Sequence, residues 1–305
     1  MSDLSSFAVV TPAIAVNDFL LEAMASVRGQ LYKGDVEHWI VFDRLESEIG
    51  RLPKQIRDWE SERNPKLRVI FNCGVRGPSA ARNLALENIK KDIVCFLDAD
   101  DLWDESYLST VNRIFNENSD VTAVTVPGVE FGSSGLSGRY SVPITRAGRL
   151  NWKDILWNPI GCPSGFSLRW NERNSRFRFN TNVRYCEDYL YYVNIAVAYK
   201  ESFYRPSKIN FFYRRSSVQA TSAPDKHLIA ISKRAFLGSL KDAPFDSLTH
   251  WQRLHLTLHA HFRFDRLLSK HFSFKELATI LIICITTPKW GIAHFRRFLT
   301  TTNNL

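Results

Sequence analysis

The sequence predicts an α/β fold in which a mostly parallel sheet is flanked by helices, followed by a helical C-terminal extension. Two observations carry this prediction. Over the first 126 residues, short apolar runs alternate with amphipathic stretches, which is the pattern of β-α-β units. From residue 225 onward, apolar positions recur at helical spacing instead. We therefore expect one domain over residues 1–224 and a helical extension over residues 225–305.

Four expected strands lie in the first third of the chain, over residues 7–11, 39–42, 67–71 and 93–97. A helix is expected after each of the first three. Asn17 is suited to cap the first helix, Pro53 is expected to break the second, and Pro78 suits the first turn of the third. The fourth strand, IVCFL, is apolar throughout, as a strand covered on both faces should be.

The pattern is weaker after the fourth strand. We expect a fifth strand over residues 121–126, a loop or hairpin over 128–140, a helix over 185–199 and a strand over 209–214. Between residues 140 and 184 neither helical nor strand periodicity is clear.

Charge and cysteine content narrow the class of protein. Forty Lys and Arg against thirty-one Asp and Glu give a net charge of +9, which favours a polyanionic partner such as a phosphorylated substrate, an anionic membrane surface or nucleic acid. The five cysteines contain no C-x-x-C pair, which argues against a disulfide framework and a zinc knuckle. The N-terminus does not resemble a secretory signal, and no apolar run approaches the roughly 20 residues of a membrane span. We expect a cytoplasmic protein.

Carboxylates stand where the second and fourth strands end, the edge at which parallel α/β sheets bind ligands. Asp43 follows the second strand and could accept hydrogen bonds from a nucleobase or ribose, or could cap a helix. Asp98 and Asp100 follow the fourth strand, and in extended backbone residues two apart face the same side. Two convergent carboxylates suit Mg²⁺ or Mn²⁺ bridged to substrate phosphates. The alternative is an acidic turn in which Asp101 or Asp104 caps the next helix.

A glycine-containing loop, GVRGPSAARN over residues 74–83, enters the third helix. Free N–H groups at a helix start, with Arg76 and Arg82 nearby, suit an anionic ligand. The loop lacks the G-K-[ST] ending of a Walker A motif, and the chain contains no G-x-G-x-x-G. A dinucleotide-dependent dehydrogenase is therefore disfavoured.

Five segments occur in an order and spacing that resemble the bacterial family 2 glycosyltransferases of the GT-A fold, a Rossmann-like arrangement. They are FAVVTP, IVFD, GPSAARNLALE, IVCFLDADD and CEDYLYYV, within residues 5–222. The resemblance implies that Pro12, Asp43 and Arg82 border the nucleotide, with Asp43 facing the base. It also implies that Asp98 faces the ribose and a bound metal, and that Asp100 is a direct metal ligand.

The same resemblance assigns an acceptor side. Glu187 and Asp188 look like the family's acceptor-side pair, in which the aspartate is the catalytic base. Residues 213–217, which include Arg214 and Arg215, resemble the segment that closes over the donor diphosphate. The chain departs from the family pattern in two loops. TPAIAVND replaces the commoner I-P-x-Y-N opening, and FDRLESE lacks the usual second Asp and Ser-x-Asp. Both departures concern nucleotide contacts.

Glycosyl transfer from a nucleotide diphosphate needs a Lewis acid at the leaving group and a base at the acceptor hydroxyl. Asp98 and Asp100 with Mn²⁺ or Mg²⁺, helped by Arg214 or Arg215, suit the first task, and Asp188 suits the second. A single displacement inverts the anomeric configuration. We therefore expect an inverting, metal-dependent glycosyltransferase that moves a sugar, from a UDP-sugar in particular, to a saccharide or lipid-linked acceptor in cell-surface polysaccharide synthesis.

Two alternatives stay open at this point: a sugar nucleotidyltransferase, which would release pyrophosphate, and a non-catalytic, basic nucleic-acid-binding protein. No helix-turn-helix, zinc-finger or RNP signature supports the second. Residues 250–305 interleave basic and bulky apolar side chains, a pattern typical of a helix lying on an anionic membrane. Ordinary packing of terminal helices against the catalytic domain explains the pattern equally well. Membrane attachment on the inner face of the cell membrane is thus a further expectation.

Overall fold

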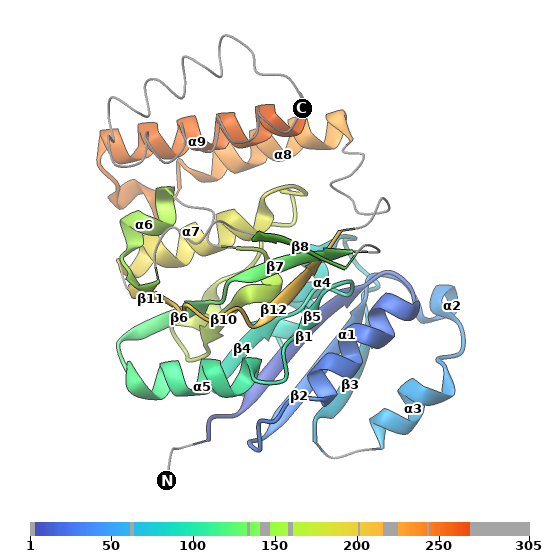
Figure 1. The fold of residues 1–305 in the computed structure, drawn as a ribbon. Coiled ribbons are helices and arrows are strands. Elements are labelled where there is room, and N and C mark those ends of the chain that lie inside the picture. The colour runs from blue at the N-terminus through green and yellow to red at the C-terminus, as the bar shows by residue number, and fades with distance from the viewer. Residues whose placement is uncertain are drawn as a thin grey trace. The chain divides into compact units, whose positions relative to one another are not determined.

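The computed structural model describes residues 4–61, 64–132, 135–140, 147–157, 161–200, 202–215, 225–242 and 244–268. Residue contacts divide the chain into two compact units, Met1–Gln219 and Ala220–Leu305. The sequence pattern had suggested a boundary slightly later, after residue 224. Unit 1 carries the mixed α/β elements, and unit 2 carries helices (Figure 1).

The first half of unit 1 alternates strands and helices, as predicted. Its elements are β1 (Phe7–Ala13), α1 (Asp18–Arg28), β2 (Val36–Phe42), α2 (Glu46–Ile49), α3 (Lys54–Glu60), β3 (Lys66–Phe71), α4 (Pro78–Leu86) and β4 (Ile93–Phe96). Asn17 caps α1, since its side chain accepts a hydrogen bond from the Leu20 N–H at 2.9 Å. Pro53 lies between α2 and α3, at the cap position before α3, and α2 has already ended at Gly50, whose φ is +73°.

The second half of unit 1 is less regular. Its elements are β5 (Leu102–Trp103), α5 (Tyr107–Glu117), β6 (Val121–Thr125), β7 (Gly128–Gly132), β8 (Gly135–Tyr140), β9 (Gly148–Leu150), α6 (Trp152–Trp157), η1 (Pro163–Gly165), β10 (Phe166–Arg169), η2 (Asn174–Arg176), α7 (Glu187–Tyr199), β11 (Ser202–Arg205) and β12 (Phe211–Arg214). The expected hairpin after the fifth strand is the antiparallel pair β7–β8. Strands β5, β9, β10 and β11 were not predicted.

The main sheet has the strand order β3-β2-β1-β4-β10-β6-β11-β9. Strands β3, β2, β1 and β4 run parallel, while β10 is antiparallel to both of its neighbours. A second sheet has the order β5-β12-β7-β8, and β5 follows β4 after a single turn. Strand β12, far along the chain, therefore ends beside the turn that follows β4.

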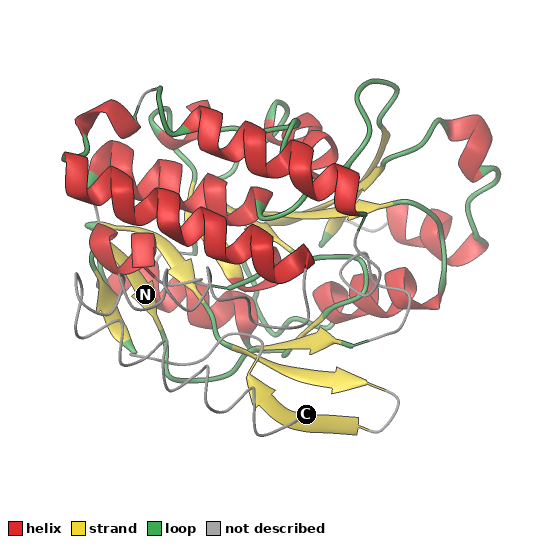
Figure 2. Cartoon of the chain, turned by 90° about the horizontal axis from the view of Figure 1, so that it is seen from above, coloured by secondary structure: helices red, strands yellow, loops and turns green. Residues whose placement is uncertain are grey.

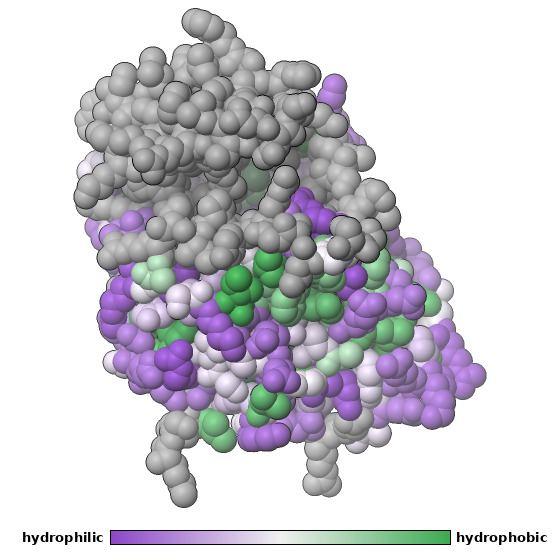
Figure 3. All heavy atoms as spheres, viewed as in Figure 1, coloured by the Kyte–Doolittle hydropathy of each residue, from purple (hydrophilic) through white to green (hydrophobic). Residues whose placement is uncertain are grey.

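Helices cover both faces of the main sheet. One face packs against side chains of α4 and α7, among them Ala81, Ala85 and Tyr191. The other packs against side chains of α1 and α5, such as Val27 and Val111. The result is a three-layer α/β/α unit, in which strands lie between helices (Figure 2). On the face shown in Figure 3, hydrophobic residues gather in a band across the middle, and hydrophilic ones lie below it.

Pro12 occupies a central strand without breaking it. Val10 O accepts a hydrogen bond from Leu97 N, and Ala13 O accepts one from Asp43 N. Alternate residues of β1 therefore face β4 and β2, so the nitrogen of Pro12 faces the β4 side. Pairing with β4 ends at Val10. The missing N–H of Pro12 thus costs no bond in the ladder.

Unit 2 contains α8 (Lys226–Ser239), η3 (Phe245–Ser247) and α9 (His250–Leu268). Asp225 caps α8 through the N–H groups of His227 and Leu228. The rings of Phe236 and Phe264 join the two helices, with centroids 5.7 Å apart. In the part of the chain that the structure describes, we find no helix with the length and apolarity to cross a bilayer. Residues 269–305, which carry most of the membrane prediction, lie outside the described residues and are not tested here.

Candidate active site

The carboxyl ends of β1, β2 and β3 are joined by backbone hydrogen bonds that continue past the strands. Asp43 N donates to Ala13 O at 2.7 Å, and Asn72 N donates to Phe42 O at 2.8 Å. Three large hydrophobic side chains in the loops at this edge, Ile14, Leu45 and Val75, are exposed. The edge therefore combines exposed apolar side chains with a backbone that is fixed by hydrogen bonds.

Asp43 is buried and organises the loop that follows β3. Its carboxylate accepts hydrogen bonds from Asn72 Nδ2 at 2.8 Å and from the Gly77 N–H at 2.6 Å. Arg76 donates to the Asp43 carbonyl at 2.8 Å and pairs with Glu48 at 2.7 Å. Asp43 thus contacts the start of α4, not the helix that follows it in sequence.

Gly77 stands at the cap position of α4 with φ at +124°, a conformation that favours glycine. A Cβ atom here would lie 1.8 Å from Nη1 of Arg184. The guanidinium of Arg184, three residues before α7, therefore rests against the start of α4. This contact brings the loop before α7 to the edge where β1 to β3 end.

Arg82 is the buried centre of the site, with its side chain 3% exposed. Its Nη2 donates to Asp98 Oδ1 at 2.7 Å, and its Nη1 donates to Glu187 Oε1 at 3.3 Å. Burial by itself would lower the pKa of Arg82, but the charges of Asp98 and Glu187 outweigh that effect and raise it. Arg82 therefore links the turn after β4 to the start of α7. Its guanidinium is directed at protein carboxylates.

The segment with Asp98 and Asp100 is a turn, which corrects the expectation of extended backbone. Asp101 N donates to Asp98 O at 3.1 Å, and Ala99 and Asp100 form the turn between them. The two-residue alternation of a strand therefore does not apply here. Asp98 is fixed from a further side, because its N–H donates to Ser164 Oγ at 3.0 Å.

Asp101 is fully buried. It does not cap α5, although the sequence had left that role open for it. Its carboxylate accepts hydrogen bonds from Ser164 Oγ at 2.5 Å and from the Arg214 N–H at 2.9 Å. Burial, together with the charges of Asp100 and Asp98, raises the pKa of Asp101. Three carboxylates therefore cluster at the end of β4.

The chemistry of this cluster fits a hard divalent cation that is bound together with its substrate. Asp98 and Asp100 are only partly buried and offer carboxylate oxygens, the ligands that Mg²⁺ and Mn²⁺ prefer. Within the described ranges, no group of three or more His, Cys, Asp or Glu side chains is arranged so that it could hold a metal ion by itself. Phosphate oxygens and water would therefore complete the shell of a cation held by Asp98 and Asp100.

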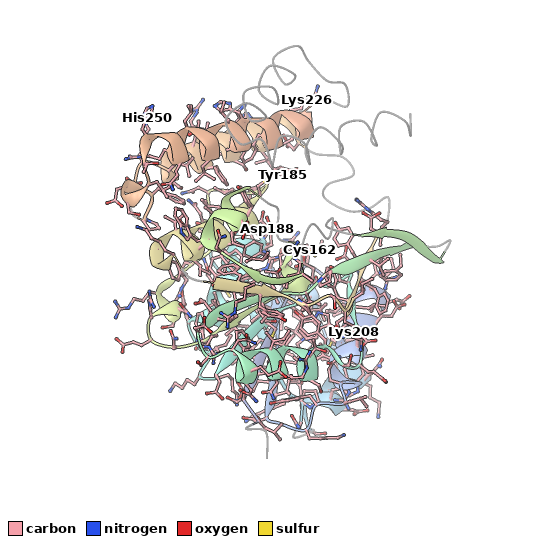
Figure 4. The ribbon with its side chains drawn as sticks, turned by 60° about the vertical axis from the view of Figure 1, so that its left-hand side comes forward. Cys162, Tyr185, Asp188, Lys208, Lys226 and His250 are labelled. Carbon is pink, nitrogen blue, oxygen red and sulfur yellow. The ribbon has the colours of Figure 1, made fainter. Side chains whose placement is uncertain are left out.

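Glu187 and Asp188 begin α7, directly after Cys186 in the left-handed conformation with φ at +61°. Burial and the charge of Asp188 raise the pKa of Glu187 to about 7, against the opposing charge of Arg82. Burial is the largest of these effects on the pKa of Glu187. Burial and the charges of Asp101, Asp98 and Asp188 likewise raise the pKa of Cys162. Asp188 and Cys162 are both labelled in Figure 4.

The two arginines at the end of β12 are engaged with the protein. Arg214 Nη2 pairs with Glu22 of α1, and Arg214 Nε donates to the Asp100 carbonyl at 2.7 Å. Arg215 pairs with Glu130 of β7 at 2.7 Å. Sequence reasoning singled out both arginines but neither glutamate. It also missed Ser164, which belongs to no motif and reaches Asp101 and Asp98 only through the fold.

These features define an α/β unit with charged side chains gathered where its parallel strands end, and comparison with known proteins identifies the class. The model of the family "Glycosyl transferase family 2" matches residues 8–174, more than half of the chain. The chain belongs to this family and is a glycosyltransferase, as the sequence resemblance predicted. Membership of this family disfavours the two alternatives, a sugar nucleotidyltransferase and a non-catalytic nucleic-acid-binding protein.

The chain is similar to the minor teichoic acid biosynthesis protein GgaA of Bacillus subtilis (strain 168), with 25% identity over 224 residues. The match covers 70% of this chain and 48% of GgaA, so the chain spans about half the length of this relative.

Two solved structures share the fold. S. aureus TarS 1–349 in complex with UDP-GlcNAc matches with a TM-score of 0.67 and 16% identity, over 92% of this chain and 80% of that one. The mannosyltransferase PcManGT from Pyrobaculum calidifontis, in complex with GDP-Man and Mn²⁺, matches with a TM-score of 0.60 and 16% identity, over 98% and 81%. The fold is therefore GT-A-like, as predicted.

Proposed function

We propose that this glycosyltransferase moves a sugar from a UDP-sugar to a saccharide or lipid-linked acceptor by a metal-dependent, inverting displacement. One observation supports this most directly. Arg82 holds Asp98, on the candidate donor side, and Glu187, on the candidate acceptor side, with one buried guanidinium. A single displacement requires donor and acceptor groups to be close at the same time, and this bridge keeps their supporting carboxylates together.

The donor would lie along the edge formed by the loops after β1, β2 and β3, at the end of β4. Asp98 and Asp100 would hold Mn²⁺ or Mg²⁺, which neutralises charge on the diphosphate leaving group when bound. Exposed apolar side chains such as Ile14 and Val75 give this edge a surface for a nucleobase. UDP is favoured as the nucleotide because TarS, with the same fold, binds UDP-GlcNAc.

Asp188 would accept the proton of the acceptor hydroxyl as that oxygen attacks the anomeric carbon. The C1–O bond to the diphosphate breaks in the same step, so an α-linked donor would give a β-linked product. Glu187 is the poorer candidate for the base, because its carboxylate is directed to Arg82. Its role would be to orient Arg82 and the first turn of α7.

The proposed pathway is synthesis of a cell-surface polysaccharide of the teichoic acid type. GgaA, whose match covers 70% of this chain, is a minor teichoic acid biosynthesis protein. A teichoic acid is a phosphate-bearing polymer, and the net charge of +9 suits an anionic acceptor.

The test is a panel of UDP- and GDP-sugars incubated with the protein, with Mn²⁺ or with EDTA, in which released nucleotide diphosphate is measured. We expect release from one UDP-sugar, stimulated by Mn²⁺ and lost in Asp100→Ala. Glu172→Gln, at a side chain 92% exposed and far from the site in the fold, serves as the matched control. Full turnover in EDTA would refute metal dependence, and an α-linked product by NMR would refute inversion.

A further inference from the structure

The Arg214 side chain is largely buried and packs against two aromatic rings. It is 12% exposed, and its guanidinium carbon lies 4.4 Å from the ring centroid of Phe19 and 4.5 Å from that of Phe131. These rings belong to α1 and β7. Cation–π contact in a desolvated position favours one orientation of the planar group.

Arg214 holds the turn after β4 at two points. Its Nε donates to the Asp100 carbonyl at 2.7 Å, and its backbone N–H donates to Asp101 Oδ1 at 2.9 Å. The turn itself is closed by the bond from Asp101 N to Asp98 O. The position of the Asp98 and Asp100 carboxylates therefore depends on where Arg214 stands.

Glu22 completes this arrangement from α1. Its carboxylate pairs with Arg214 Nη2, while Nε of the same guanidinium bonds the Asp100 carbonyl. Glu22 lies on α1, 192 positions away in sequence, and is 51% exposed. An exposed ion pair adds little to stability by itself. A planar guanidinium bonded to two groups, here the Asp100 carbonyl and the Glu22 carboxylate, is however fixed in direction.

We propose that Glu22 is a positioning residue: acting through Arg214, it fixes the turn that carries Asp98 and Asp100 and so sets the affinity of the site for the metal-bound donor. The proposal rests on the proposed function for the identity of that ligand. It does not make Arg214 a ligand of the diphosphate. Without Glu22, the guanidinium loses its carboxylate partner, and a contact between it and a carboxylate of the turn would displace a group meant for the cation.

The first test needs no ligand. Hydrogen exchange in the full-length protein is compared between wild type and Glu22→Gln, over peptides that contain residues 98–103 and 211–215. We expect faster exchange in both peptides, because the Arg214 and Asp101 N–H groups lose fixed partners. Asp18→Asn removes one negative charge from an exposed position on the same helix and should leave both peptides unchanged. Unchanged exchange in Glu22→Gln would overturn the proposal, whatever the donor is.

The second test is calorimetric titration of UDP in Mn²⁺ and in EDTA. Groups that orient metal ligands typically contribute 10- to 100-fold in metal affinity. We expect Glu22→Gln to weaken UDP binding about tenfold in Mn²⁺ and not at all in EDTA, with Glu22→Asp in between. A purely structural role would weaken both equally and would contradict the proposal.

A double variant separates direct from transmitted effects. If Glu22 acts through Arg214, then Glu22→Gln adds no loss of UDP affinity in an Arg214→Met background. A full additional tenfold loss there would contradict this route. Failure of the proposed function looks different: wild-type UDP binding would then be weak or independent of Mn²⁺, while the exchange result would still decide whether Glu22 fixes the turn.

Discussion

A single buried guanidinium holds the candidate site together at the scale of residues. Arg82 is nearly inaccessible to solvent and pairs with Asp98 and Glu187 from two distant segments. Removing one partner of a buried ion pair leaves an uncompensated charge, which typically costs about 3–5 kcal/mol. Variants of Arg82, Asp98 or Glu187 are therefore expected to lose both activity and stability. They are poor choices for assigning chemical roles.

Asp188 is the better residue for such an assignment, because it is itself the candidate base, and the hydrogen bond that it accepts from the Tyr189 N–H at 2.7 Å can also be accepted by an amide oxygen. Asp188→Asn keeps the shape of the side chain but cannot take up a proton at neutral pH. We expect transfer to fall by about 10²- to 10⁴-fold, the usual contribution of a general base. UDP affinity, measured by calorimetry, should stay within a few-fold of wild type. Undiminished transfer would assign the base to another carboxylate.

His38 gives a prediction about pH and stability. It is buried in β2, with Nε2 2.9 Å from Thr11 Oγ1. Burial, and secondarily the charge of Arg28, lowers the pKa of His38 from 6.5 to about 3. The stability this group contributes is therefore complete above pH 6.5 and is lost as the pH falls toward 3. Between pH 7 and 4.5 the loss should be roughly 2–3 kcal/mol.

The measurement is the free energy of unfolding in urea at several pH values, for wild type and His38→Asn. The variant lacks the titrating group but keeps a polar side chain beside Thr11. We expect its free energy of unfolding to fall less steeply with acid than that of wild type, while carboxylates common to both proteins cancel in the comparison. Equal slopes would show that His38 is not the group responsible.

The sequence indicated candidates for the chemistry, but it did not indicate what those residues touch. Asp98, Asp100 and Asp188 stand out because they follow a buried strand or begin a helix. The contacts of Asp101 with Ser164 span 63 positions and those of Arg214 with Glu22 span 192. Spacing patterns report only neighbours within a few residues. No local pattern could therefore predict either pair.

The same limit explains which elements were predicted. Strands β1 to β4 and helix α7 are long or apolar enough to show a period, and each lies near its expected position. Strands β5, β9, β10 and β11 have two to four residues, too few for an alternating pattern. Such short strands depend on pairing with segments that are distant in the sequence: β10 pairs with β4 and β6, and β5 pairs with β12.

The junction of η1 and β10 gives a prediction at the scale of elements. Val126 N donates to Gly165 O at 2.7 Å, which brings two backbones into close contact. A Cβ atom at Gly165 would lie 2.4 Å from Val126 O and 2.7 Å from the buried ring of Phe211. Neither can move freely. Gly165→Ala should therefore destabilise unit 1 by about 1–3 kcal/mol, the usual cost of overpacking.

Urea unfolding measures this cost, and Gly29→Ala is the matched control. Gly29 ends α1 at φ −75°, and a Cβ atom there would lie no closer than 3.4 Å to any atom. We expect a change below about 0.5 kcal/mol for the control. Gly165→Ala should also slow transfer, because it displaces Ser164, which holds Asp101. A variant as stable and active as wild type would show that the two strands can separate at little cost.

At the scale of the whole molecule, the two units differ in what they contribute to the candidate site. Unit 1 contains the whole of the family match, residues 8–174, and every candidate site residue. The described part of unit 2 is helical and contributes none of the candidate site residues.

The last prediction is that residues after about 246 attach the enzyme reversibly to an anionic membrane surface, where a lipid-linked acceptor would be found. Residues 272–305 hold four Lys or Arg against one Glu, together with apolar positions at helical spacing. Each basic residue near an anionic leaflet adds about 1 kcal/mol, an attraction that salt screens. Full-length protein should therefore float with anionic liposomes at low salt, and less at high salt or with zwitterionic liposomes. A chain truncated before Phe272, and Arg296→Gln combined with Arg297→Gln, should float less. Since packing of the same residues against protein requires no lipid, full-length protein that stays at the bottom under every condition would refute membrane attachment.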